Sequence, residues 1–242
     1  MSTPDGCALV TIIDDERRSR PMLMTLGRRV PDPTTVSSVT HTSSGQTWDE
    51  RYGEEGWAFG TEPNDFLRDV ATTLPSGDVL VLGDGEGRNG VYLAQRGLRI
   101  VSVDLSPVGV AKARDLAAAR GVEIDARVAD LATFDMGIEQ WDAIVSIFCH
   151  LPAALRSAVH ARARGALRVG GRFVLEAYVA ANIGRGVGGP QSPDMTPSLD
   201  ELERDFEGWE LDLHREVERP VIEGRYHSGL SATVQFVAVK PR

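Results

Sequence analysis

Cysteine is scarce in this sequence, and long apolar runs are missing. The 242 residues include only two cysteines, Cys7 and Cys149. A chain of this size buries a substantial core without disulfides, so this low content indicates a reducing compartment such as the cytoplasm. No stretch approaches the ~20 continuous apolar residues that cross a bilayer, and the N-terminus lacks the apolar segment of a secretory signal. We therefore expect a cytoplasmic protein that does not insert into membranes.

Basic residues are in the minority. The chain has 26 Lys and Arg against 35 Asp and Glu, and its formal net charge is -9. Such a balance repels a phosphate backbone, so nucleic acid is not an expected partner. Histidine is also rare, and the histidines at 41, 160 and 227 lack metal-ligand spacing, so no metal is expected. A small molecule is the expected partner, and a monomer is favoured over an oligomer.

Sustained periodicity is absent from residues 1–41, which mix Pro, Ser, Thr, Arg and Asp. We interpret them as a disordered leader. The arginines also suit an organelle transit peptide, although the acidic run at 14–16 is unusual in one, and a start codon assigned too early would look the same. Residues 42–242 are expected to form one domain, with lid helices over 42–75 and a core over 76–242.

Apolar runs alternate with helical segments from Gly77 onward. The runs at 78–83 and 98–103 are apolar almost throughout, as strands covered on both faces must be. A Gly/Pro-rich tract at 182–197 precedes a last helix and two final strands. The pattern predicts an α/β fold: a doubly wound, mostly parallel, seven-stranded Rossmann-like sheet that ends in an antiparallel C-terminal hairpin.

Helix boundaries are marked by capping residues. Ser106 is the expected N-cap of a helix that Pro107 begins. An amphipathic helix over 152–168 is expected to be interrupted at Gly165. Ser198 begins a short helix with a capping box.

A glycine-rich turn follows the first strand of this pattern. Gly85, Gly87 and Gly90 spell the G-x-G-x-x-G of a dinucleotide site, and Asp104 follows at the spacing of an acid that grips a ribose. Gly83, Gly85 and Gly87 equally spell a G-x-G-x-G loop, which is typical of S-adenosylmethionine sites. Both ligands need a tight turn and close backbone approach, which glycine permits. The glycines alone therefore leave two nucleosides open.

Acidic residues in and after the loop favour the sulfonium ligand. Asp84 and Glu86 would repel a diphosphate but attract the ammonium and sulfonium cations of S-adenosylmethionine. Asp130, just past the third strand, is placed to accept from an adenine amino group, with the Leu131 backbone completing the base edge. We therefore predict S-adenosylmethionine as the cofactor.

The order of these segments resembles a known family, the class I S-adenosylmethionine-dependent methyltransferases. It is most similar to the small-molecule branch that includes tellurite-resistance and thiopurine-type enzymes. The resemblance runs from about Trp48 to the C-terminus. It is carried by "FGTEPNDFL", "LGDGEGRN", "VDLSP", "VADLATF", "VSIFCHLP" and "LRVGGRFVLEAY".

This resemblance implies roles for individual residues. It places the methionine part on the glycine loop, the ribose on Asp104, the adenine near Asp130, and a lid over the site whose helix begins near Thr61 and Pro63. The residues it assigns to the cofactor are Phe59, Gly60, Gly83, Gly85, Glu86, Gly87, Arg88, Asp104, Leu105, Ser106, Asp130 and Leu131. Arg88 is expected to reach the carboxylate. Val81 stands where many relatives carry an acid, so Asp84, Glu86 or the Gly83 carbonyl must hold the ammonium group.

Methyl transfer needs mainly alignment, because the cofactor already carries an activated leaving group. We expect an in-line displacement onto a small soft nucleophile, that is, a thiol, selenium or tellurium species. His150, after the fourth strand, is the candidate base, although a histidine bound to backbone there would serve structure alone. The adjacent Cys149 is expected to be packing.

Other features leave alternatives open. Trp48, Trp57 and Phe59 either close over an apolar acceptor or belong to the core, and the tract at 182–197 is a candidate flap. Basic side chains near the final hairpin either bind an anionic acceptor or form a solvated face; these are His214, Arg215, Arg219 and Arg225. The rival functions are an NAD-dependent oxidoreductase and a non-catalytic S-adenosylmethionine-binding protein.

Overall fold

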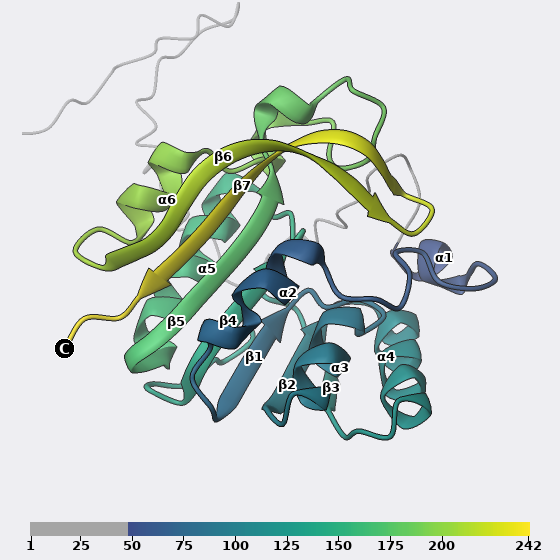
Figure 1. Cartoon of the computed structure of the whole chain (residues 1–242), viewed down its shortest axis with the longest axis horizontal. Helices are drawn as coiled ribbons and strands as arrows, with labels where there is room; N and C mark the ends of the chain where they lie inside the picture. The colour runs from purple at the N-terminus through teal and green to yellow at the C-terminus, as the bar shows by residue number, and fades with distance from the viewer. Residues whose placement is uncertain (1–47) are drawn as a thin grey trace, which may run out of the picture. The chain divides into compact units, whose positions relative to one another are not determined.

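The computed structural model describes residues 48–242 (Figure 1). The expected leader, residues 1–41, lies outside this range. None of the helices within 48–242 is long and apolar enough to cross a membrane.

One seven-stranded sheet organises these residues, in the order β3-β2-β1-β4-β5-β7-β6. The first five strands are parallel to one another, and β7 runs antiparallel to both β5 and β6. The predicted fold class is thereby confirmed. The strands are β1 (Asp78–Leu82), β2 (Arg99–Asp104), β3 (Asp125–Val128), β4 (Trp141–Ile147), β5 (Leu167–Tyr178), β6 (Glu210–Glu223) and β7 (His227–Val239).

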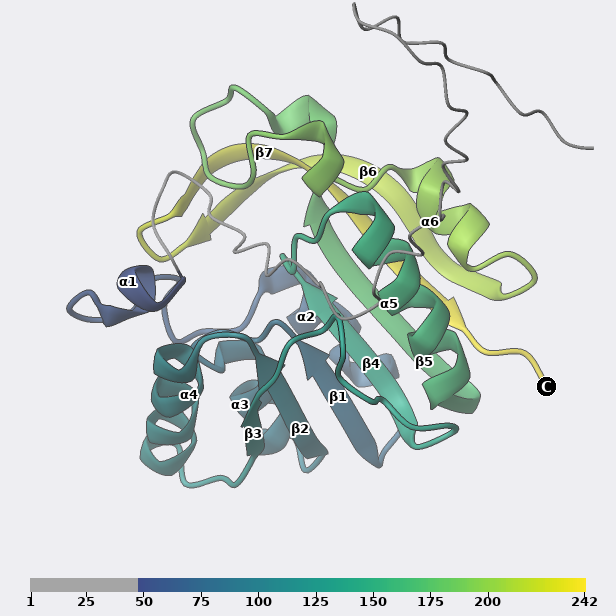
Figure 2. The same ribbon diagram turned by 180° about the vertical axis from the view of Figure 1, so that it is seen from behind.

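Helices cover both faces of the sheet (Figures 1 and 2). They are α1 (Trp48–Gly53), α2 (Asp65–Val70), α3 (Arg88–Gln95), α4 (Pro107–Ala119), α5 (Ala153–Ala166) and α6 (Leu199–Asp205), with short 3-10 turns at Ala71–Thr73, Ala180–Asn182 and Pro193–Met195. Because side chains alternate along a strand, Val79 and Val81 pack with α2 and α3, while Leu80 and Leu82 pack on the side of α5 and α6. The core therefore has two main layers, one on each face of the sheet.

Local signals explain most helix boundaries. Ser106 caps α4, because its Oγ accepts a hydrogen bond from the Gly109 amide at 3.1 Å, and Ser198 caps α6 in the same way through Glu201. The expected interruption at Gly165 is wrong, since α5 continues through it to Ala166. Packing of α5 on the sheet outweighs the roughly 1 kcal/mol that glycine costs in a helix.

Two N-terminal elements differ in what they cover. Helix α2 begins at Asp65, with Asn64 as its N-cap, and buries Phe66 and Leu67 against the sheet. It is thus core rather than lid. Helix α1 and the turn of the β6–β7 hairpin lie side by side beyond the carboxyl ends of the parallel strands (Figures 1 and 2). This is the edge where open α/β sheets bind their ligands.

Candidate active site

The glycines of the loop after β1 lie in close contact with side chains from other segments. Gly83, Gly85 and Gly87 have φ of 59°, 56° and 86°, in the left-handed region that glycine favours. A Cβ at Gly83 would lie 2.6 Å from Cys149 Sγ, one at Gly85 2.5 Å from Tyr52 Oη, and one at Gly87 2.5 Å from Ala113 Cβ. The protein itself therefore demands glycine at all three positions.

Asp84 occupies the N-terminal end of α3. Its carboxylate accepts from the Gly90 amide at 3.2 Å and from Ser102 Oγ at 2.9 Å. Burial raises the pKa of Asp84 to about 7, against the lowering effect of Ser102 and the Gly90 amide. A carboxyl group thus stands where a dinucleotide would place its diphosphate.

The loop's backbone donors are also engaged inside the protein. The Asp84 amide donates to the Val103 carbonyl at 3.2 Å, the Gly85 amide to Asp104 Oδ2 at 2.8 Å, and the Gly87 amide to the Asp84 carbonyl at 3.0 Å. A diphosphate needs such donors free. Together with Asp84, this arrangement argues against a nicotinamide dinucleotide.

Asp104 ends β2 beside the glycine loop. Its two carboxylate oxygens accept from the Gly85 amide and, at 2.9 Å, from the Ser106 amide, and burial raises its pKa. An ionised carboxylate has about four acceptor positions, so these two bonds fix its orientation and leave capacity for ligand hydroxyls. The group fits a ribose.

Asp130 lies at the same edge. The Ala129 amide donates to the Asp104 carbonyl at 2.8 Å, which brings the two segments together, and the Asp130 side chain is exposed. Leu105, next to Asp104 in the loop after β2, is 49% exposed, whereas Leu131 is buried in the core. An exposed apolar side chain next to Asp104 fits the face of a nucleobase.

Glu86 holds the lid rather than facing outward. Its carboxylate accepts from the Ala58 amide at 2.8 Å and lies 3.0 Å from Lys112 Nζ, while a weaker contact of 3.4 Å reaches the Phe59 amide. These bonds tie the segment that contains Phe59 and Gly60 to the glycine loop. The same segment contacts the hairpin turn, since the Arg225 amide donates to the Ala58 carbonyl at 2.9 Å.

Tyr52 is a site residue that the sequence analysis missed. It is buried, lies against Gly85 and Gly109, and has its pKa raised by burial and by the nearby Asp104 and Glu86. The "DERY" segment of α1 thus covers the glycine loop. Trp48 and Phe59 contact the Tyr52 ring, at centroid distances of 5.6 and 6.3 Å.

The other aromatic residue considered for the lid lies elsewhere. Trp57 packs with Val91, Leu116 and Ala117 from α3 and α4. Of the three aromatics, Trp48 and Phe59 are therefore near the loop, and Trp57 is half-buried against α3 and α4.

Arg88 belongs to a buried polar network that was also missed. It donates to Glu223 at 2.5 Å, and Glu223 accepts from Asn64 Nδ2 at 2.9 Å. Arg219 donates to both oxygens of Glu176, at 2.8 and 2.6 Å. Burial opposes ionisation, but His227 and Arg88 outweigh it and lower the pKa of Glu223 to about 2. Two carboxylates and two guanidinium groups thus neutralise one another.

The remaining basic groups of the hairpin are paired as well. His214 lies 2.7 Å from Glu203, Arg215 donates to Gln235, and Arg225 lies 3.1 Å from Glu54. With Arg219 held by Glu176, these side chains do not form a free anion-binding surface.

His150 is held by the Gly/Pro-rich tract. Its Nδ1 lies 3.1 Å from the Met195 carbonyl, which only accepts, so Nδ1 carries the proton and Nε2 presents a lone pair. Burial lowers the pKa of His150 to about 3, so the ring is neutral near pH 7. Nε2 is buried and has no hydrogen-bond partner among residues 48–242.

The residues just before His150 mark a strained position. Phe148 has φ of 50°, which a bulky side chain adopts only when its surroundings impose it, and such outliers cluster at functional sites. Cys149 packs on Gly83, and burial followed by the charge of Asp104 raises its pKa to about 12. The Cys149 thiol therefore stays protonated, in agreement with a packing role.

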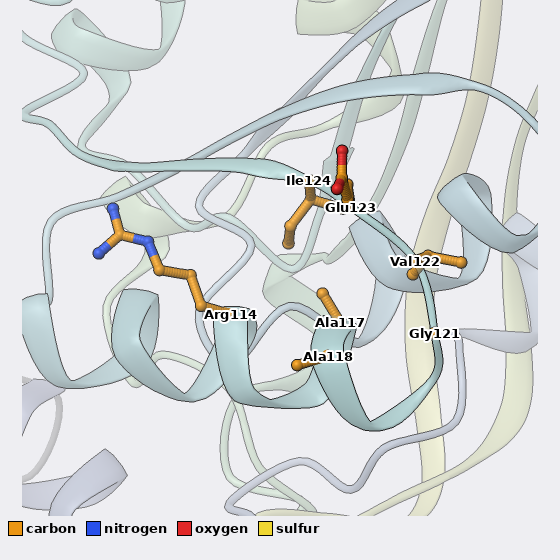
Figure 3. A pocket seen from close by; sticks show the side chains of 7 residues that line it. All are labelled: Arg114, Ala117, Ala118, Gly121, Val122, Glu123 and Ile124. Carbon is orange, nitrogen blue, oxygen red and sulfur yellow. The ribbon is translucent and has the colours of Figure 1, made fainter.

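A surface hollow occurs far from this edge. Figure 3 shows its lining side chains, which come from the end of α4 and the segment that leads into β3, among them Ala117 and Ile124. That segment lies at the amino end of β3, whereas the glycine loop, Asp104 and His150 follow the carboxyl ends of their strands. The hollow is not part of the candidate site.

Comparison with known proteins agrees with this geometry. Residues 79–171 match the family model described as a methyltransferase domain. A curated relative, 2-heptyl-1-hydroxyquinolin-4(1H)-one methyltransferase of Mycobacteroides abscessus, is 27% identical over 159 residues, which span 64% of this chain and 69% of the relative.

Solved structures share the fold. One, which concerns the conversion of a disulfide bond into a thioacetal group during echinomycin biosynthesis, superposes with a TM-score of 0.63 at 22% identity, covering 80% of this chain and 88% of the other. TehB from Haemophilus influenzae gives a TM-score of 0.60 at 22% identity, covering 72% of this chain and 61% of TehB.

The fold and the matched segment define a methyltransferase domain. The chain is an enzyme, an S-adenosylmethionine-dependent methyltransferase, and S-adenosylmethionine is its cofactor. The expected enzyme class and cofactor are thereby confirmed.

Proposed function

We propose that this enzyme transfers the methyl group of S-adenosylmethionine to a nucleophilic atom of a small molecule, and that His150 accepts the proton of that atom. The observation that carries the proposal is the unpartnered, buried Nε2 of His150, three residues after the end of β4, the strand that pairs with β1 ahead of the glycine loop. Met195 fixes the imidazole so that its lone pair is available. A buried acceptor without a donor is rare in proteins, and a ligand donor would satisfy it.

The cofactor is assigned to the edge formed by the glycine loop, β2 and the segment after β3. Asp104 is proposed to bind the ribose, Asp130 and Leu131 the adenine edge, and Leu105 the adenine face. Gly83, Gly85, Gly87 and Arg88 are proposed to line the methionine part, with Glu86, Phe59, Gly60 and Ser106 shaping the loop and its lid. Both oxygens of Asp84 and of Glu86 accept from protein donors, with the Gly90 amide shared between the two oxygens of Asp84, which favours the Gly83 carbonyl as the ammonium partner.

Methyl transfer depends more on the alignment of the acceptor atom with the methyl group than on acid or base strength. Bound S-adenosylmethionine supplies an activated methyl group, whose bond to sulfur breaks with its electron pair as the acceptor's lone pair forms the new bond. Alignment of two reactants contributes about 7 to 11 kcal/mol in well-oriented systems. The lid and hairpin turn, joined through Ala58 and Arg225, exclude water from that alignment.

The acceptor is proposed to be a small soft nucleophile, with a thiol, selenium or tellurium species as the class. A histidine with a low pKa is a weak base, so it suits an acceptor whose proton becomes strongly acidic as the new bond to the methyl carbon forms, as the proton of a thiol or selenol does. One fold neighbour is named for the conversion of a disulfide bond into a thioacetal group, which is sulfur chemistry.

An acidic hydroxyl on a ring is the second candidate. It is favoured by the aromatic residues Phe148 and Tyr178, whose centroids lie 4.6 Å apart beside His150. The curated relative from Mycobacteroides abscessus is named for a hydroxyquinolinone. We further infer a monomeric, cytoplasmic enzyme whose catalytic domain spans 42–242.

The test is methyl transfer itself. The enzyme is incubated with methyl-labelled S-adenosylmethionine and a panel of thiols, selenite, tellurite and acidic hydroxyl compounds. His150→Ala should lower kcat about 10²- to 10⁴-fold for protonated acceptors, whereas His214→Ala, at an exposed histidine on the hairpin, should not.

Two outcomes would contradict the proposal. Binding of S-adenosylmethionine without transfer to any acceptor would favour a non-catalytic binding protein. Full activity of His150→Ala on protonated acceptors would remove the histidine from the mechanism.

A further inference from the structure

His150 belongs to a group of rings that contact one another. We call it the aromatic box: Phe59, Phe148, His150, Tyr178 and His227. Ring centroids are 4.6 Å apart for Phe148 and Tyr178, 5.6 Å for His150 and Tyr178, and 5.2 Å for Tyr178 and His227. Phe59 contacts His227 at 4.6 Å. The box therefore joins the lid segment, the end of β4, the end of β5 and the start of β7.

Three polar atoms of the box are buried and have no partner with the distance and angle of a hydrogen bond among the described residues, although Ser231 lies close enough to Tyr178, and Glu223 to His227, to act on their pKa values. They are His150 Nε2, Tyr178 Oη and His227 Nδ1. Tyr178 is fully buried and His227 is only 6% exposed. The nearest acid to His227 Nδ1 is Glu223 Oε2 at 3.7 Å, which is too long for a hydrogen bond. Unpartnered buried groups are costly, and three in one cluster point to a ligand that pairs with them.

The box carries no free charge. Arg88 and Arg219 are neutralised by Glu223 and Glu176. Burial lowers the pKa of His150 and of His227, so both rings are neutral near pH 7. A charged oxyanion would lose its hydration here and would have to compete with Glu223 and Glu176 for the nearby guanidinium groups, whereas an uncharged ring would stack favourably.

Two glycines make the cover of the box. A Cβ at Gly189 would lie 2.3 Å from the Tyr178 ring, and one at Gly188 would lie 2.2 Å from the Tyr226 carbonyl oxygen. The tract at 182–197 therefore lies directly on the rings, and Ser228 of the hairpin donates to its Val187 carbonyl at 3.1 Å. The cover is made of loop and hairpin turn, the parts of a fold that move most easily.

We propose that the aromatic box is the acceptor site, that it selects an uncharged, planar aromatic acceptor, and that Tyr178 and His227 determine this specificity by hydrogen bonding to polar groups on the ring. The inference rests on the proposed methyl transfer and names its substrate class. In it, the nucleophile donates to His150 Nε2, and a second polar atom of the ring pairs with Tyr178 Oη. The acceptor enters when the tract at 182–197 and the hairpin turn move aside.

The first experiment separates the ring from the nucleophile. Benzyl mercaptan and propanethiol carry thiols of similar chemistry but differ in the aromatic ring. The wild-type enzyme should show at least a tenfold higher kcat/KM for benzyl mercaptan. Equal values, or a preference for the aliphatic thiol or for tellurite, would overturn the proposal.

The second experiment tests Tyr178. For an N-hydroxyquinolone, whose carbonyl can pair with the phenol, Tyr178→Phe should lower kcat/KM about tenfold, which corresponds to about 1.4 kcal/mol. For naphthol, which lacks the carbonyl, the change should stay within about twofold. Tyr92→Phe, at a tyrosine on α3 that stacks on Arg96, is the matched control and should leave kcat/KM unchanged for both acceptors. If Tyr178 served folding alone, Tyr178→Phe would lower kcat/KM equally for both acceptors, and this result would contradict the proposal.

Binding measurements keep this inference separate from the proposed function. Calorimetry of the enzyme loaded with S-adenosylhomocysteine reports acceptor binding without turnover. If no compound is methylated, the proposed reaction fails, yet tight quinolone binding that His227→Phe and Tyr178→Phe weaken, with naphthol binding unchanged in Tyr178→Phe, would still support the site. Absence of ring binding to the loaded enzyme would overturn it.

Discussion

Replacement of Asp84 by asparagine should make the protein more stable at neutral and higher pH. The carboxyl is buried under the glycine loop, and its pKa rises from 3.8 in a model peptide to about 7 in the fold. At about 1.4 kcal/mol per pKa unit, this difference corresponds to about 4 kcal/mol. Because the folded state holds the proton more tightly, stability is greatest below pH 3.8 and is lost as the pH rises toward 7.

The asparagine side chain has the same shape and keeps an acceptor for Gly90 and a partner for Ser102. The free energy of unfolding, measured in urea, should therefore favour Asp84→Asn over wild type increasingly between pH 5 and pH 8, by about 2 to 3 kcal/mol. Subtraction of the two curves removes the titration of other groups. A difference that does not change with pH, or one that grows toward low pH, would refute the assignment of a raised pKa to Asp84.

Three further substitutions probe the loop, the network and the lid. Gly85→Ala should lose more stability than Gly97→Ala. Both positions have positive φ, which costs an alanine about 1 to 2 kcal/mol, but only the new Cβ at position 85 would clash with a neighbour, Tyr52 Oη at 2.5 Å. Equal losses in thermal unfolding would rule out that contact. Glu176→Gln should cost about 3 to 5 kcal/mol because it breaks the buried pair with Arg219, whose other acids, Glu223 and Asp65, lie at the longer distances of 3.5 and 3.8 Å. Glu218→Gln, exposed beside Arg185, should cost under about 1 kcal/mol. Glu86→Gln should increase hydrogen exchange at the Ala58 amide, and unchanged protection would show that the lid is held by other contacts.

The parallel sheet and its hairpin could be predicted because each strand and each helix cap is a local pattern. Runs such as 78–82 are apolar on both faces, and Ser106 caps a helix through a residue three positions away. The glycine loop and Asp104 could be placed together because consecutive parallel strands bring their carboxyl ends to one edge.

Much of the site depends on partners that lie far apart in the sequence. Asn64 meets Glu176 and Glu223 across 112 and 159 positions, and no local signal links them. Asp84 and Glu86 were expected to face a cationic ligand, but the structure turns both carboxylates onto protein donors, since their local backbone directs them to α3 and to the lid segment. Tyr52 could have been suspected only from its place in an aromatic-rich segment.

The central claim is that S-adenosylmethionine binds at the edge formed by the glycine loop and Asp104. Calorimetric titration with S-adenosylmethionine tests it most directly, on wild type, Asp104→Asn, and Asp135→Asn as an exposed control. Loss of a hydrogen bond to a charged group, about 1.5 to 3 kcal/mol, should raise the Kd of Asp104→Asn about 10- to 100-fold and leave Asp135→Asn unchanged. A folded Asp104→Asn variant that binds the cofactor as tightly as wild type would contradict the account.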